Sequence, residues 1–283
     1  MPLDDDGNRG PRMDIRPRAR HLAVIVSAAV LGLFVTPAPA GAGGVSGLVE
    51  GPAHPVGAGN ARTYVTVDEA GTPATIGVRL DAAALDDLPG ALLPVTEAYV
   101  LELPEEAAAT AFDHVTVDWN SHGHDPQHGF DVPHFDVHFY LLDRPTVESI
   151  HPFAPGYIPA AARVPDPRYV PEGYAPSGDP LTSTVAGMGL HWVDTTEAEH
   201  DPAAGHHLTE TVLYGTWDGR QAFIEPMLSR EWLATRPAHH EELRLPEAYH
   251  REGLYPTTYS VWWDEASQTY TVELGGLTMR EAS

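Results

Sequence analysis

The stretch HFDVHFYLL, residues 134–142, decides the fold because polar and apolar side chains alternate along it. Side chains of a β-strand point in turn to opposite faces of the sheet. One face then carries the polar set His134, Asp136, His138 and Tyr140. The other face is apolar and carries Phe135, Val137, Phe139 and Leu141. The stretch predicts a strand with its apolar face in a hydrophobic core and its polar face toward solvent, a cavity or the mouth of a barrel.

Segments of the same kind occur on both sides of this strand. Alternating or β-branched runs predict strands at residues 63–67, 74–80, 97–103, 113–119, 209–217, 221–227, 256–263 and 269–274. Asp218-Gly219 between two of them is a hairpin signal. Short helices are predicted at residues 81–88, 104–110 and 229–234. The sequence therefore predicts a mainly β fold, an antiparallel barrel or sandwich with a few short helices.

A proline-rich stretch interrupts this pattern at residues 151–180, where eight prolines and three interleaved tyrosines occur. We expect a long loop there. Long loops inside a compact domain are uncommon and are often functional. A lid over a site, a segment that wraps the domain and an arm exchanged between subunits are all compatible with this composition.

The N-terminus has the pattern of an export signal. Arginines precede an apolar run at residues 22–35, and Ala38-Pro39-Ala40 matches a cleavage site. The run is short for a permanent membrane span, although an uncleaved anchor is the alternative. We expect a signal peptide at residues 1–40, cleavage near Ala40, a flexible leader at 41–61 and a single β-rich domain at 62–283. This organisation predicts a secreted protein with no stable membrane span after cleavage.

Composition narrows the chemistry that is possible. The chain has no cysteine, so any metal site must use histidine, carboxylate or backbone oxygen ligands. The net charge is −24 and lysine is absent, which excludes nucleic acid as a partner and suits solubility or the attraction of cations.

Histidines gather around the deciding strand. The candidate metal ligands are His122 and His124 in the preceding loop, His134 and His138 on the strand, and His191 in the segment GMGLHWVD. Residues two apart on a strand are separated by about 6.6 Å, and residues four apart by about 13 Å. His134 and His138 can therefore share one ion only where the strand bends.

Histidine and carboxylate ligands without thiolate suit Zn²⁺ or Cu²⁺, and two histidines with one carboxylate also suit Fe²⁺. The candidate catalytic groups are Asp136 and Glu225, either of which can act as the general base in metal-assisted hydrolysis or hydration. Asp136 can also be a ligand beside one of the strand histidines, and Glu225 can be a further ligand or accept a hydrogen bond from an imidazole N–H. Non-catalytic binding or uptake of the ion is a second use of the same site.

Two other functions fit the residues. The histidines and acids can form a buried polar network in a non-catalytic, structural or oligomeric protein of the cell envelope or of a stress response. The tryptophans Trp192, Trp217, Trp262 and Trp263 can form a carbohydrate or ligand-binding surface, although scattered strand tryptophans usually belong to a core.

The motifs H-G-H-D-P, D-V-P-H-F-D-V-H-F-Y, G-M-G-L-H-W-V-D, L-Y-G-T-W-D-G and F-I-E-P-M resemble those of an uncharacterised family of exported bacterial proteins. The resemblance covers roughly residues 63–277, including the closing Y-P-T-T-Y segment. It implies a mainly β domain that can form homo-oligomers, and it implies no activity. The cupin pattern fails because no Glu follows the H-x-H pair at the expected distance, and the H-x-D-x-H strand departs from the α-type carbonic anhydrases.

Overall fold

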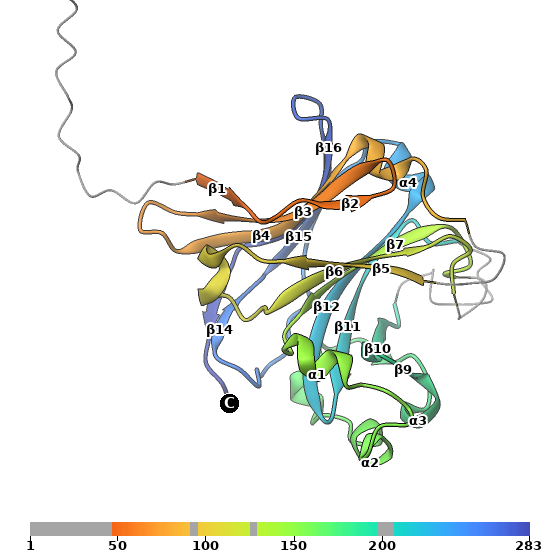
Figure 1. Ribbon diagram of the computed structural model, residues 1–283. Coiled ribbons are helices and arrows are strands. Elements are labelled where there is room, and N and C mark those ends of the chain that lie inside the picture. Colours follow the sequence, from red (N-terminus) through yellow and green to blue (C-terminus); the bar gives the residue numbers. More distant parts are fainter. Residues whose placement is uncertain (1–46, 91–95, 125–128, 197–206) are drawn as a thin grey trace, which may run out of the picture. The chain divides into compact units, whose positions relative to one another are not determined.

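The computed structural model contains two large antiparallel β-sheets that face each other (Figure 1). The structure describes residues 47–90, 96–124, 129–196 and 207–283. All described residues lie in one compact unit of the chain, Ala42–Ser283.

In the described part of the chain the first sheet follows the order β1-β3-β4-β16-β15-β13, and β2 pairs with β3. Its strands are β1 (Gly47–Glu50), β2 (His54–Val56), β3 (Gly59–Val67), β4 (Pro73–Asp81), β13 (Ala238–Glu242), β15 (Thr258–Asp264) and β16 (Thr269–Gly275).

The second sheet carries the histidines and follows the order β5-β6-β7-β12-β11-β10-β8, with β9 paired to β10. Its strands are β5 (Thr96–Glu102), β6 (His114–Asn120), β7 (His134–Tyr140), β8 (Tyr174–Pro176), β9 (Thr184–Val185), β10 (Gly189–Asp194), β11 (Glu210–Trp217) and β12 (Arg220–Ser229).

Short elements complete the described fold. A small two-stranded sheet pairs β14 (Gly253–Tyr255) with β17 (Thr278–Arg280). The helical turns are η1 (Ala82–Leu85), η2 (Glu105–Ala109), α1 (Arg144–Glu148), α2 (Tyr157–Ala161), η3 (Pro167–Tyr169), α3 (Pro180–Ser183) and α4 (Arg230–Ala234). Among the described residues, none of these helices is long and apolar enough to cross a membrane.

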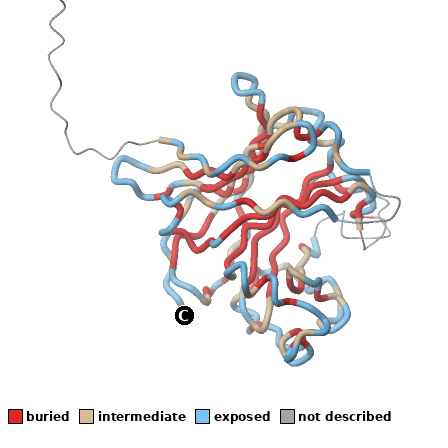
Figure 2. The backbone as a smooth tube through the Cα atoms, viewed as in Figure 1, coloured by how far each residue is buried: buried red, intermediate tan, exposed pale blue. Residues whose placement is uncertain are grey.

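The main hydrophobic core lies between the two sheets. The first sheet contributes side chains such as Val78 and Val272, and the second contributes Val117, Phe135 and Phe139. Figure 2 shows the buried segments concentrated on the strands of both sheets. The mainly β, antiparallel prediction is confirmed, and of its two alternatives the fold is sandwich-like, with no closed barrel among the described strands.

The predicted hairpin at Asp218-Gly219 is present. Trp217 and Arg220 are register partners, so the turn has two residues, and both have positive φ, 51° for Asp218 and 73° for Gly219. Positive φ at both central residues matches the right-handed twist of the strands that flank the turn. The register of β11 against β12 then shifts between Thr216 and Gly215, before the part of β12 that carries Glu225.

The flexible leader expected at residues 41–61 is wrong over its described part, because β1, β2 and the start of β3 lie there. β1 pairs with β3, and Val56 and Ala61 are buried in the main core. The glycines and prolines concealed these strands, because they leave only a few apolar residues, of which Val56 and Ala61 are buried. The expected signal peptide, residues 1–40, lies outside the described residues.

The loop expected at residues 151–180 is also different from the structure, which places α2, η3 and β8 there. Its prolines start short helices: Asp166 and Asp179 accept hydrogen bonds from Arg168 and Leu181, with a proline at the first helical position each time. β8 then pairs with β10 and extends the second sheet. The segment therefore lies beside β10, the strand that carries His191.

Candidate metal centre

The polar face of β7 points away from the main core and carries a layer of ionisable side chains across the second sheet. Register pairs Asp136 with Asp118 of β6 and with Met227 of β12. It also pairs His138 with Thr116 and His134 with Asn120. Every residue of β7 is buried, so the polar face meets further protein and a cleft rather than open solvent.

The first group of ligand-type residues is the Glu225 triad, which we define as His138, His191 and Glu225. Nε2 of His138 lies 3.4 Å from Oε1 of Glu225, and Nε2 of His191 lies 3.3 Å from Oε2. Three strands supply the triad: β7, β10 and β12. The His138 and Glu225 side chains are almost completely buried, and His191 is 13% exposed.

The second group is the Asp136 triad, which we define as His124, His134 and Asp136. Nε2 of His134 lies 3.1 Å from Oδ1 of Asp136, and Nε2 of His124 lies 3.4 Å from Oδ2. The two imidazole rings are 4.8 Å apart between centroids. His134 and Asp136 are buried, whereas 39% of the His124 side chain is exposed.

Both triads have the spacing of a metal site. Within each, one ligand atom per residue can be chosen so that all lie within 4.8 Å of one another. With metal–ligand bonds of about 2.0–2.1 Å, two ligands of a tetrahedral zinc ion lie about 3.3–3.4 Å apart. The nitrogen–oxygen separations of 3.1–3.4 Å agree with this value. Two histidines and one carboxylate in each triad leave further coordination positions open.

Buried atoms without hydrogen bonds concentrate at the Glu225 triad. Within the described part of the chain, both ring nitrogens of His138, Oε2 of Glu225 and Oδ1 of Asp118 have no partner of acceptable geometry. Nδ1 of His138 nevertheless lies 3.0 Å from Oδ2 of Asp118. Buried polar atoms normally have partners, and exceptions often mark an ion or a water molecule. A carboxylate behind an imidazole is also the usual support of a metal-binding histidine.

The close packing of charges shifts the pKa values at this triad. Burial lowers the pKa of His138, but the carboxylates of Glu225, Asp118 and Asp136 outweigh it and raise the pKa to about 9. Burial raises the pKa of Glu225 to about 8, against the opposing charge of His138. Burial lowers the pKa of His191 to about 3, with repulsion from His138 in the same direction.

Asp136 behaves differently. Burial raises the pKa of its carboxyl group, but the imidazoles of His134 and His124 outweigh burial and hold the pKa well below its usual range. The carboxylate is therefore charged at neutral pH, and it sits in the same buried layer as the carboxyl groups of Asp118 and Glu225.

A cleft gives access to both triads. Asp136 and His124 line it from one triad and His191 from the other. Its empty space is about 1270 Å³, counting the part open to solvent. Part of the lining consists of hydroxyl side chains in and near α3 and β9: Ser177, Thr182, Ser183 and Thr184. Another part is apolar and consists of Phe130, Val185, Met188, Val193 and Leu213. The end of the proline-rich segment thus borders the site.

The structure brings together six of the seven residues expected from the sequence. They form two neighbouring triads rather than one site, because His134 and His138 are four residues apart on a regular strand. His122 lies apart from both: it is exposed, and its Nδ1 is 2.9 Å from the hydroxyl of Ser121. A third group, Glu210, His239 and Glu241, has contacts of 3.7 Å between His239 and each carboxylate and is partly exposed.

Sequence reasoning missed three supporting residues: Asp118, Asn120 and Thr96. Asp118 and Asn120 occupy alternate positions of the strand before the histidine loop, so both lie on the polar face. Pairing that strand with residues 134–140 would have placed them beside Asp136 and His134. Thr96 carries no signal of its own, because its contact depends on the pairing of β5 with β6.

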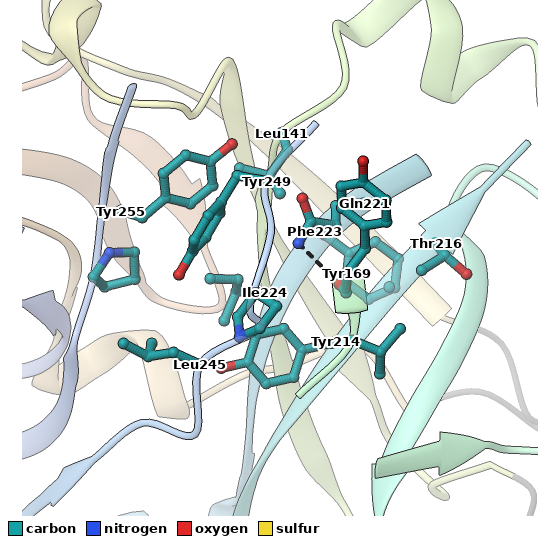
Figure 3. Close-up of a pocket in the computed structure, with 14 residues that line it drawn as sticks. Leu141, Tyr169, Tyr214, Thr216, Gln221, Phe223, Ile224, Leu245, Tyr249 and Tyr255 are labelled. Atoms are coloured by element: carbon teal, nitrogen blue, oxygen red, sulfur yellow. Dashed lines mark hydrogen bonds between the residues drawn. The ribbon is translucent and has the colours of Figure 1, made fainter. Parts of the chain in front are cut away.

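A second pocket lies between the β11–β12 hairpin and the chain around residues 245–256 (Figure 3). Figure 3 shows the rings of Tyr169, Tyr214, Tyr249 and Tyr255 around it, with Gln221 donating a hydrogen bond of 2.9 Å to the backbone oxygen of Tyr169. Among the described residues that line it there is no histidine, carboxylate or arginine.

Fold and site together define a β-sandwich-like protein with a buried histidine–carboxylate centre. Residues 68–119 match the family model described as TTHB210-like, hypothetical protein TTHB210, which is a family without an assigned activity. The match covers β4 to Trp119 in β6 and ends before the first histidine motif. No curated protein and no solved structure matches the chain significantly.

Proposed function

We propose that this protein binds a divalent metal ion at the Glu225 triad, zinc or copper in the first place and iron as the alternative. The observation that supports the proposal most strongly is that buried nitrogen and oxygen atoms without hydrogen bonds lie close together at this triad. Nε2 of His138 and Oε2 of Glu225 make no hydrogen bond within the described chain, although imidazole and carboxylate lie 3.4 Å apart. When an imidazole nitrogen and a carboxylate oxygen bind the same ion, both point at the ion rather than at each other. The two atoms are then close together but poorly aligned for a hydrogen bond between them.

Charge supports the same proposal. Asp118, Asp136 and Glu225 bring three carboxyl groups into one buried layer. Buried carboxylates are costly unless cations or protons balance them. A divalent ion held by His138 and Glu225 balances two of these charges and satisfies His138, with Asp118 behind the ring.

The alternative is a polar network in which protons replace the ion. His138 would be an imidazolium between Asp118 and Glu225, and Glu225 would be protonated toward His191. This alternative is favoured by the nitrogen–oxygen distances of 3.0–3.4 Å between these imidazoles and carboxyl groups, because a shared proton can bridge atoms at such distances. It corresponds to the structural, non-catalytic function expected as the second candidate from the sequence.

The ion would be open to substrate. His191 lines the cleft, and three protein ligands leave room for a further one, as in catalytic zinc sites. The reaction class we propose is metal-assisted hydrolysis or hydration of a small molecule, in which a bound ion polarises the reacting group. Of the roles expected for Glu225 from the sequence, this proposal assigns it that of a metal ligand rather than that of the general base.

Metal analysis of the full chain, purified without a histidine tag, tests the proposal. We expect bound zinc or copper after dialysis, and one ion fewer per chain in Glu225→Gln and in His138→Ala. His122→Ala is the matched control and should keep the metal, because this ring lies outside both triads. A metal-free protein whose melting temperature does not change with chelator would support the proton network instead.

We also propose that the protein is exported and that residues 1–40 are removed. The apolar run and the cleavage pattern support this proposal. Expression of the full chain in a bacterial host and N-terminal sequencing test it. A first residue at or near Gly41 in the extracytoplasmic fraction is expected, and an uncleaved chain in the membrane fraction would overturn it.

A further inference from the structure

We propose that the Asp136 triad binds a second divalent ion, so that one cleft holds two metal ions. The proposal extends the proposed function, since both ions would serve the same cleft. It rests on observations at His134, Asp136 and Asn120 that are independent of the Glu225 triad.

The protonation of His134 follows from its neighbours. Nδ1 of His134 lies 2.7 Å from the backbone oxygen of Val132, which can only accept, so Nδ1 carries a proton. A neutral His134 then has its lone pair on Nε2. This is the arrangement in which most metal-binding histidines are held, with one nitrogen fixed by an acceptor and the other free for the ion.

Asn120 supports the same assignment from the other side. The hydroxyl of Thr96 donates a hydrogen bond of 2.6 Å to Oδ1 of Asn120, which places the amide nitrogen toward the triad. That nitrogen donates to Oδ2 of Asp136 at 2.7 Å and lies 3.4 Å from Nε2 of His134. Since an amide nitrogen is a donor, Nε2 of His134 faces it as an acceptor.

A lone pair on His134 conflicts with its nearest carboxylate unless a cation intervenes. Nε2 lies 3.1 Å from Oδ1 of Asp136, an acceptor that is buried without a hydrogen bond within the described chain. Two acceptor atoms at this distance repel each other. Either a second proton on His134 or a metal ion between the two atoms removes the conflict, and the experiment below separates them.

His124 supplies the third ligand. Its Nε2 lies 3.4 Å from Oδ2 of Asp136, and its ring lines the cleft. A backbone contact helps to hold it there: the His124 backbone nitrogen donates to the backbone oxygen of Phe130 at 3.1 Å. Gly123 has a φ of 68°, and a Cβ at this position would overlap the backbone of Phe130. His124, held by its backbone hydrogen bond, and the buried strand β7 therefore converge on one point.

The two ions would be neighbours. Asp136 and His138 are two residues apart on the same face of β7, about 6.6 Å along the strand. Asp136 and His191, one from each triad, line the same cleft. The described lining has no arginine and the chain has no lysine, so the ions would be the principal positive groups that face a bound molecule. This fits a small substrate with oxygen donors, and Asp136 is then a ligand rather than a base.

Counting ions in matched variants tests the proposal. The full chain, without a histidine tag, is titrated with Co²⁺ and with Zn²⁺, and retained metal is measured after dialysis with circular dichroism as the check on folding. We expect two ions per chain. His134→Ala and Asp136→Asn should each leave one ion, as should Glu225→Gln, while His134→Ala combined with Glu225→Gln should leave none. His122→Ala should keep both.

The outcomes separate this proposal from the proposed function. One ion per chain that disappears in Glu225→Gln and persists in His134→Ala overturns the second site and leaves the first. One ion that disappears in His134→Ala and persists in Glu225→Gln leaves a metal at the Asp136 triad and overturns both the pair and the first site. No retained ion overturns both proposals. Should His134→Ala fail to fold, Asp136→Asn gives the same count with a smaller change in volume.

Discussion

Nε2 of His138 lies 3.4 Å from Oε1 of Glu225, on adjacent strands and with both side chains almost completely buried. The opposite nitrogen of the same ring lies 3.0 Å from Asp118. An imidazole buried between two carboxylates is stable when it carries an added proton or when a metal ion binds beside it. Most of the behaviour expected of this protein depends on which of the two is present.

Metal binding at the Glu225 triad should release protons. With pKa values of about 9 for His138 and about 8 for Glu225, both groups hold a proton at pH 7 in the metal-free protein. The ion has to displace these protons, so its affinity should rise by about 100-fold from pH 6 to pH 7 and level off above pH 9. His191, with a pKa of about 3, is already neutral and contributes none.

Calorimetry in two buffers that differ in ionisation enthalpy measures this release directly. We expect about two protons per ion at the Glu225 triad at pH 7. His134→Ala is the background for the measurement, because it removes the other proposed site. Affinity that stays constant between pH 6 and pH 8 would contradict the prediction.

Asp118→Asn should lower the affinity of the Glu225 triad for the metal ion without removing a ligand. The substitution keeps the size of the side chain but takes away the negative charge beside Nδ1 of His138. Loss of such a supporting carboxylate typically lowers metal affinity about 10- to 100-fold. Competition with a chelator of known affinity measures the change.

Asp113→Asn is the matched control for this prediction. Asp113 lies 2.9 Å from Nδ1 of His114, so it forms a pair of the same kind outside the triads. Its substitution should leave metal affinity unchanged. Equal effects of the two substitutions would show that Asp118 acts through general stability or charge rather than through His138.

Zinc should raise the melting temperature. A ligand that binds the folded chain alone adds roughly 2.7 kcal/mol of stability when its concentration is 100 times its dissociation constant. For a unit of this size we expect a shift of about 5–10 °C, reversed by chelator. Calorimetric or fluorescence melting measures it. The shift should shrink in Glu225→Gln and persist in His122→Ala, and an equal shift in both would place the zinc elsewhere.

The fold was largely predictable because its strands follow two simple patterns. Alternation placed β7, β11 and β16 correctly, and Asp218-Gly219 identified the hairpin that joins β11 to β12. The strands missed at residues 47–61 are short, and their burial depends on partners in β3 and β4 that a local pattern does not contain. In the proline-rich segment, Asp166 and Asp179 were the overlooked signals, since aspartate before proline is a helix start.

The candidate site was predictable in its residues but not in its grouping. Residue type and alternation identified His134, Asp136 and His138. The division between two triads depends on three registers: β12 against β7, β11 against β12, and β10 against β11. Together they place Glu225 and His191 in one group with His138 rather than with Asp136. Register is set by strand pairing over long sequence separations, so a single sequence gives little access to it.

Gly215→Ala should disturb the Glu225 triad from a distance. Gly215 is the register partner of both His191 and Phe223, and a Cβ there would overlap the Phe223 ring. That ring packs against His138 at 4.7 Å and His191 at 4.9 Å between centroids. Phe223 would have to move, so we expect a loss of about 1–3 kcal/mol in the free energy of unfolding and weaker zinc binding at this triad.

Denaturant unfolding and zinc competition measure the two effects of Gly215→Ala. Gly90→Ala is the control, because its Cβ would meet no atom within 4 Å among the described residues and its φ is not positive. Phe223 packs on the two histidines of the Glu225 triad, so its movement should affect that triad. The Asp136 triad should keep its affinity for zinc. A variant that loses both ions equally would mean that Gly215 acts on the whole sheet, whereas selective loss at the Glu225 triad would show that Phe223 sets the position of His138 and His191.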